Sequence, residues 1–89
     1  MFRIFFSSHG DRAFGGIPEK IRQRIIVELE SLAADHLWYR RVRKLHGAEN
    51  QYRLRVGRWR VLFLLKSSEI EILDVFMKKG KEDYPRRIS

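Results

Sequence analysis

The alternation of apolar and polar residues predicts a short strand at the start of the chain and three strands in its second half. In residues 2–6, apolar side chains occupy every second position, which is the period of a strand. The same pattern runs through residues 52–65 and is interrupted only by Gly57-Arg58, which predicts a two-residue hairpin turn with glycine first. Ser67-Ser68 predicts a second turn, and residues 69–77 predict the third strand of this half.

Between these strands, residues 18–34 have the spacing of an amphipathic helix. Apolar side chains recur three and four positions apart after Pro18, a residue that is tolerated at the start of a helix. Residues 9–14 predict one or two further helical turns, closed by Gly15-Gly16. Residues 35–50 are irregular and basic, and they predict a connecting loop closed by Gly47.

The order of these elements predicts the fold class α+β. An N-terminal strand and one or two helices pack on one face of an antiparallel sheet, which three C-terminal strands complete. With 89 residues, the chain is expected to form a single domain spanning 1–89. The longest apolar run, residues 61–65, is too short to cross a bilayer, so we expect no membrane association.

Counting outward from the hairpin turn predicts which strand residues share a face. Val56 then lies opposite Trp59, and Arg55 lies opposite Arg60. The face expected to cover the helices is wholly apolar: Tyr52, Leu54, Val56, Trp59, Val61, Phe63 and Leu65. The reverse face carries the arginines: Arg53, Arg55 and Arg60.

The third of these strands can be phased in the same way. Strict alternation turns one set of side chains toward the helices: Ile70, Ile72 and Phe76. The other set falls on the arginine side: Leu73, Val75, Met77 and Lys79. Asp74 would then point at the helices, which indicates either a bulge in the strand or a buried ion pair.

The formal net charge of +8 indicates an anionic partner, with nucleic acid first and an acidic protein or a membrane surface after it. The alternative is that the charge serves only solubility. The sequence has no cysteine, which favours the cytoplasm and excludes disulfides, thiolate zinc sites and a thiol nucleophile. Its histidines and carboxylates lack the spacing of a metal site, so we expect neither a metal nor another cofactor.

Arginines on neighbouring strands repel one another, and like charges directly opposite cost a few tenths to about 1 kcal/mol. Folding alone does not account for this cluster. Because the guanidinium fork matches phosphate oxygens, the cluster predicts an anion site, with Leu62 and Leu64 as its apolar floor. The alternative is a solvated strand face whose arginines are separated by water or paired with glutamates.

Residues 44–47 read KLHG, and residues 52–61 read YRLRVGRWRV. These segments resemble the central signature of the RelE/ParE toxin superfamily, K-L-x-G followed by Y-R-x-R-x-G-x-[YW]-R-[VI], and the element order is similar over nearly the whole chain. The resemblance implies a type II toxin that a cognate antitoxin protein holds inactive. RelE-like members cleave mRNA in the ribosomal A site without a metal, whereas ParE-like members inhibit DNA gyrase and cut nothing.

The end of the chain favours the RelE branch, whose members carry a basic residue after the last strand and a tyrosine shortly beyond it. Lys79 and Tyr84 stand in these places, with lysine where arginine is more usual. The resemblance therefore implies a catalytic set: Arg53, Arg55, Arg60, Lys79 and Tyr84. Further residues are expected to bind RNA: Lys44, Arg58, Lys78 and Lys81.

In this hypothesis the arginines hold the scissile phosphate and stabilise the charge of its transition state. Tyr84 acts as the base or stacks on a nucleobase, and Lys79 or an arginine protonates the leaving oxygen. Two alternatives remain open, a ParE-like gyrase inhibitor and a module that binds nucleic acid without acting on it.

Overall fold

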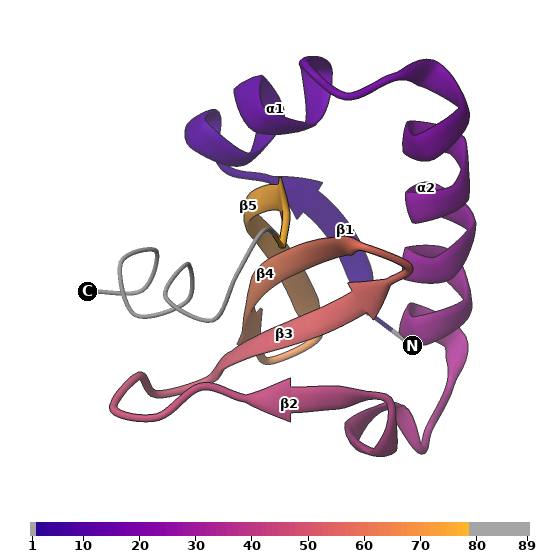
Figure 1. The fold of residues 1–89 in the computed structure, drawn as a ribbon. Helices are drawn as coiled ribbons and strands as arrows, with labels where there is room; N and C mark the ends of the chain where they lie inside the picture. The colour runs from indigo at the N-terminus through magenta and orange to yellow at the C-terminus, as the bar shows by residue number, and fades with distance from the viewer. Residues whose placement is uncertain (1, 79–89) are drawn as a thin grey trace.

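The structure, a computed structural model, describes residues 2–78 and has the predicted α+β fold (Figure 1). Its elements follow in the order β1 (Arg3–Phe6), α1 (Ser8–Gly15), α2 (Glu19–Ala34), the 3-10 turn η1 (Trp38–Arg40), β2 (Val42–Lys44), β3 (Gln51–Val56), β4 (Trp59–Lys66) and β5 (Glu69–Met77). Both predicted helices and all four predicted strands are present. No helix in the described part of the chain is long and apolar enough to cross a membrane.

The five strands form one sheet in the order β1-β5-β4-β3-β2. Neighbouring strands are antiparallel except for β1 and β5, which run parallel, with Phe6 opposite Ile72. The expectation of a purely antiparallel sheet is therefore wrong at this edge. The chain leaves β1 through both helices and returns to pair β5 beside it, so the first and last strands become neighbours in the same direction.

The residues between α2 and β3 are not the simple loop that their irregular pattern predicts. They contain η1 and the short edge strand β2, which pairs with β3 so that Val42 lies opposite Leu54. Val42 packs against the main core, and this contact with an already formed sheet accounts for the strand.

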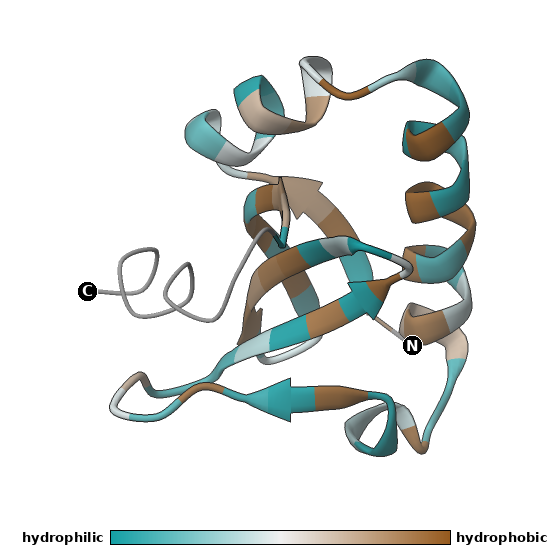
Figure 2. Ribbon diagram, viewed as in Figure 1, coloured by the Kyte–Doolittle hydropathy of each residue, from teal (hydrophilic) through white to brown (hydrophobic). Residues whose placement is uncertain are grey.

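The main core lies between the helices and the sheet. Ile25 and Leu29 of α2 are fully buried there together with Val61 and Phe63 of β4. Apolar segments recur along α2 and along the strands in Figure 2. A smaller cluster lies on the reverse face of the sheet, where the segment after β2 folds back over it: Leu45, Leu62 and Phe76, with Ala48 and Leu73 packed against them.

A β-bulge interrupts the pairing of β4 with β5. Leu62 lies opposite Asp74 and Phe63 lies opposite Ile72, so Leu73 is an extra residue in β5. Of the two explanations suggested for Asp74, the bulge is confirmed, and the buried Asp74 carboxylate also lies 3.3 Å from Nε2 of His9.

The bulge reverses the predicted phase of the second half of β5. Val75 pairs with Val61 on the helix side and Met77 pairs with Trp59, whereas Phe76 joins the cluster on the reverse face. The predictions that Phe76 faces the helices and that Val75 faces the arginines are wrong for this reason, whereas Met77 lines a pocket together with Arg55 and Arg60.

Candidate nucleic-acid interface

The hairpin around Gly57 has the predicted register. Val56 lies opposite Trp59, Arg55 opposite Arg60 and Leu54 opposite Val61. Gly57 has a φ of 61°, the left-handed conformation that a two-residue turn with glycine in first position requires. Arg53, Arg55 and Arg60 therefore lie on the face of the sheet that turns away from α2.

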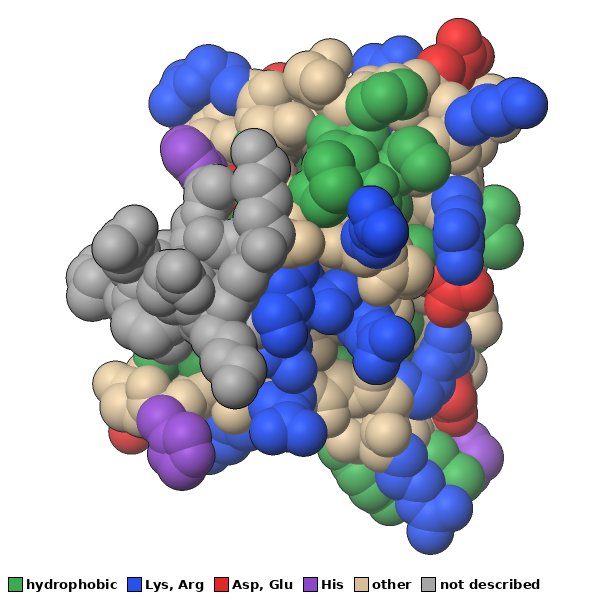
Figure 3. All heavy atoms as spheres, viewed as in Figure 1, with side chains coloured by type: hydrophobic (Ala, Val, Ile, Leu, Met, Phe, Trp, Pro, Cys, Tyr) green, Lys and Arg blue, Asp and Glu red, His purple; other side chains and the backbone are tan. Residues whose placement is uncertain are grey.

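Two neighbouring strands enlarge this arginine cluster. Arg43 of β2 lies directly opposite Arg53, and Lys78, which follows β5, lines an open pocket of ≈ 530 Å³ together with Arg55, Arg58 and Arg60. We call this surface the basic face: Arg43, Arg53, Arg55, Arg58, Arg60 and Lys78. Figure 3 shows Lys and Arg side chains gathered over the strands on the side turned to the viewer.

Arg60 is the rigid centre of the basic face. Only 8% of its surface is exposed, and its Nη1 donates hydrogen bonds to the carbonyl oxygens of Gly57 at 2.9 Å and Trp59 at 3.0 Å. The side chain thus ties the hairpin turn to the strand that follows it. A cation held in this way needs little reorganisation when negative charge develops beside it.

The other cations of the pocket are more accessible. Arg55 and Arg58 are exposed, and no Asp or Glu is among the described residues that line the pocket with them. Two arginine pairs, Arg55–Arg60 and Arg43–Arg53, lie directly across strand pairs. Several cations placed side by side in this way make the local electrostatic potential positive, which favours an anionic ligand.

The structure places the predicted Lys44 away from the basic face and the predicted Lys78 on it. Lys44 pairs with Tyr52, whose ring packs against the main core, so Lys44 falls on the opposite side from Arg43. Arg43 was not predicted because residues 35–50 were expected to form a loop, although the alternation of Val42 and Arg43 was a weak sign of a strand. The bulge likewise brings Lys78 to the pocket, whereas Lys79, Lys81 and Tyr84 lie outside the described residues.

Among residues 2–78, the titratable groups other than these cations do not line the pocket. His9 of α1 places Nε2 3.3 Å from Oδ1 of Asp74, which joins α1 to β5, while His36 and His46 are exposed in connecting segments. Within residues 2–78, no group of three or more His, Cys, Asp or Glu side chains could hold a metal ion. The chemistry that the described basic face offers is therefore anion binding and charge stabilisation.

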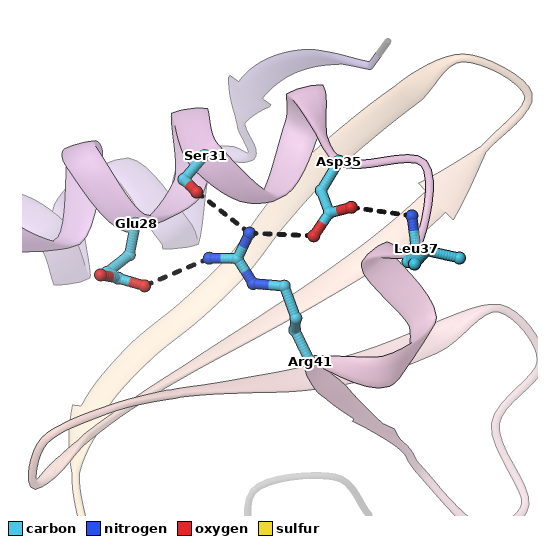
Figure 4. A network of polar contacts seen from close by, with 5 residues as sticks. All are labelled: Glu28, Ser31, Asp35, Leu37 and Arg41. Carbon is cyan, nitrogen blue, oxygen red and sulfur yellow. Dashed lines mark hydrogen bonds and ion pairs between the residues drawn. The ribbon is translucent and has the colours of Figure 1, made fainter.

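Arg41 lies near the basic face but is directed toward α2 (Figure 4). Its guanidinium donates to Ser31 Oγ at 3.0 Å and contacts the carboxylates of Glu28 and Asp35, each at 3.4 Å. The backbone N–H of Leu37 and the Arg41 guanidinium lower the pKa of Asp35, against a weaker opposing effect of desolvation. This network fixes the start of β2 to the end of α2.

Neither protein-family models nor curated proteins match this sequence, whereas several solved structures match the fold. The isolated E. coli RelE toxin is 14% identical, with a TM-score of 0.73, over 99% of this chain and 96% of that one. The archaeal RelE-RelB complex from Pyrococcus horikoshii contains a chain 21% identical, with a TM-score of 0.72, over 90% and 98%.

A chain of the chromosomal ParDE TA system from P. aeruginosa is 16% identical, with a TM-score of 0.66, over 89% of this chain and 98% of that one. The protein therefore has the same α+β fold as these solved structures. These three matches cover nearly the full length of both chains, so the similarity concerns the whole fold and not the hairpin alone.

Proposed function

We propose that this chain is the toxin of a type II toxin–antitoxin pair and that it cleaves mRNA without a metal ion. The observation that carries the proposal is the basic face, where the exposed Arg55 and Arg58 surround the rigidly held Arg60 in one pocket. The fold shared with RelE toxins supports the same function.

The proposed reaction is an intramolecular attack by an RNA 2′-oxygen on the adjacent phosphorus. The P–O5′ bond breaks, and the products are a 2′,3′-cyclic phosphate and a 5′-hydroxyl. A base takes the 2′-proton and an acid supplies a proton to the 5′-oxygen. Arg60, with Arg55 and Arg53 beside it, stabilises the additional negative charge of the transition state.

The remaining roles fall to the end of the chain. Tyr84 is the proposed base, or a ring that stacks on the nucleobase. Either Lys79 or one of the arginines is the proposed acid. Because the bulge at Leu73 carries Lys78 into the pocket, we add Lys78 as the cation that binds the scissile phosphate after the last strand.

We propose two classes of macromolecular partner, both in the cytoplasm. One is a cognate antitoxin protein, since the RelE chain of Pyrococcus horikoshii was solved as a complex with RelB. The other is mRNA presented in the ribosomal A site, to which Arg58 and Lys81 would add contacts. The basic face has the charge that an RNA backbone requires.

The proposal is tested by incubating the purified chain with mRNA-programmed ribosomes in the presence of a chelator that removes zinc and transition metals while Mg²⁺ is kept at a level that preserves ribosomes. We expect cleavage of the mRNA at discrete sites, with 2′,3′-cyclic phosphate and 5′-hydroxyl ends.

Arg55→Gln should reduce the rate at least about tenfold, which corresponds to about 1.4 kcal/mol of transition-state stabilisation. Arg12→Gln, which removes an exposed charge from α1, should cleave like the parent. Intact mRNA with folded parent protein contradicts the proposal.

A second candidate is inhibition of DNA gyrase without RNA cleavage. The match to a chain of the ParDE system from P. aeruginosa favours it, as does the composition of the described basic face, whose arginines stay protonated and cannot act as bases. A supercoiling assay with purified gyrase separates the two candidates. Inhibition of supercoiling together with intact mRNA would select the second.

A further inference from the structure

A second basic pocket lies beside the first, at the open edge of the sheet. It has a volume of ≈ 220 Å³, and we call it the edge pocket; its lining residues are Arg40, Arg41, Val42, Arg43, Arg53 and Arg55. Arg55 lines this pocket and also the larger pocket at the hairpin turn. The two pockets are therefore adjacent along one surface.

The local structure holds the edge pocket open toward solvent. Arg40 ends η1 and Arg43 lies in the middle of β2, and both side chains are exposed. Arg41, between them in sequence, contacts Glu28 and Ser31 of α2 and Asp35, the residue that follows α2. Because Arg41 is held against α2, the exposed side chains of Arg40 and Arg43 remain on the outer side of the sheet edge.

Protection of the sheet edge does not account for this arrangement. Charged residues on an edge strand do prevent pairing with other chains. One cation on β2 would be sufficient for that purpose, and it would not need to lie opposite another arginine. Arg43 nevertheless lies directly across from Arg53, so that two arginines on neighbouring strands face the same side of the sheet edge.

The spacing of the two pockets suits a chain of phosphates. Strands β2, β3 and β4 are neighbours, and adjacent strands lie about 4.8 Å apart. A line from Arg60 through Arg55 and Arg53 to Arg43 crosses two strand intervals, about 10 Å, and moves two residues along β3, about 7 Å, so its ends are about 12 Å apart. Since Arg55 lines both pockets, the pockets themselves lie closer together than these ends. A single-stranded polynucleotide that follows this line would place neighbouring phosphates near the two pockets.

We infer that the edge pocket is a second phosphate subsite, which binds the phosphate next to the scissile one in single-stranded RNA. The inference rests on the proposed function for its choice of RNA as the ligand. Arg40 and Arg43 bind the neighbouring phosphate from the outside, and Arg53 and Arg55 connect it to the pocket at the turn. Binding at two points fixes the register of the RNA over Arg60.

The test measures binding separately from cleavage. Short RNA oligonucleotides carry a 2′-deoxy nucleotide at the cleavage position, which prevents the reaction, and an uncharged methylphosphonate at one phosphate at a time. For the parent chain we expect weaker binding at two adjacent substitution positions. In Arg40→Gln/Arg43→Gln, one of these positions should lose its effect, and the slope of log K against log salt should become shallower by about 0.7.

A matched control, Arg12→Gln/Lys20→Gln, removes two exposed charges from the helices and should keep both sensitive positions. The inference is overturned if Arg40→Gln/Arg43→Gln keeps both positions, or if the folded parent does not bind the RNA. Binding with the expected two-position pattern but without cleavage of the all-ribose RNA would refute the nuclease proposal and leave the subsite standing. Cleavage of the all-ribose RNA by the parent, with both sensitive positions kept in Arg40→Gln/Arg43→Gln, would support the nuclease proposal and refute the subsite.

Discussion

At the scale of single residues, Arg60 combines a structural with a proposed chemical role. Its hydrogen bonds to the carbonyls of Gly57 and Trp59 hold the hairpin turn, and the same bonds hold the guanidinium in the pocket. Arg55 lies directly across from it but is exposed. Substituting Arg60 therefore changes both stability and activity, whereas substituting Arg55 isolates the chemistry.

We predict that Arg60→Ala lowers the free energy of unfolding by about 2 kcal/mol, because hydrogen bonds from a charged donor contribute about 1.5–3 kcal/mol. Urea unfolding followed by tryptophan fluorescence measures the change. Arg55→Ala is the matched control and should leave stability unchanged or raise it slightly, since it removes a like-charge pair. Equal stability of parent and Arg60→Ala would show that the turn does not depend on this side chain.

At the scale of elements, the contact of α1 with β5 depends on a glycine. A Cβ at Gly10 would lie 2.2 Å from the carbonyl oxygen of Ile72, so any side chain would push the helix away from the strand. The N-cap Ser7 adds a second constraint, since its Oγ accepts the N–H of Gly10 at 3.0 Å. The helix is thus fixed at its start against the middle of β5.

We predict that Gly10→Ala destabilises the protein by about 3 kcal/mol or more, near or above the upper end of the usual cost of overpacking. Gly15→Ala is the control, because nothing lies within 4 Å of a Cβ built there. It should change stability by less than about 1 kcal/mol. The melting temperatures of the two variants and the parent, measured by thermal unfolding, test this prediction. Similar melting temperatures for Gly10→Ala and Gly15→Ala would contradict it.

The network around Arg41 connects α2 to β2 and predicts a dependence of stability on pH. The pKa of Asp35 is lowered in the folded state by the Leu37 N–H and by Arg41. Its ionised form therefore stabilises the fold above the ordinary aspartate pKa of about 3.9, and this contribution is lost as the pH falls through the lowered value.

Accordingly, the difference in unfolding free energy between the parent and Asp35→Ala should be constant between pH 7 and about pH 5 and should shrink below about pH 4. Urea titrations at several pH values measure it. Glu49→Gln, at an exposed position after β2, controls for the loss of a carboxylate. A difference that grows on acidification would refute the assigned role of Asp35.

Some of these elements could be predicted from the sequence alone, and others could not. The hairpin was predictable to the residue, because Gly57 determines the turn and alternation determines both faces. β2 was not, because its three residues carry one apolar side chain and adopt a strand only through pairing with β3. The bulge at Leu73 was visible only as the misplaced Asp74, since an extra residue changes the phase without changing the composition of β5.

At the scale of the whole molecule, six of the basic residues lie together on one surface. The charge of +8 indicated a polyanion, and the fold brings cations from three strands, the hairpin turn and the position after β5 together as the basic face. Arg53, Arg55 and Arg60 were expected there from the hairpin alone. Arg43 was not expected, because its place depends on the pairing of β2 with β3. Lys78 was expected only from the resemblance, because its place beside the arginines depends on the bulge.

The central claim is that this surface cleaves mRNA, and primer extension on a reporter mRNA after induction of the chain in cells tests it most directly. The parent and Arg12→Gln should give the same new 5′ ends within the coding region, and Arg55→Gln should reduce or abolish them at equal protein levels. No new 5′ ends with the parent, or the same ends at the same intensity with Arg55→Gln, would contradict the account.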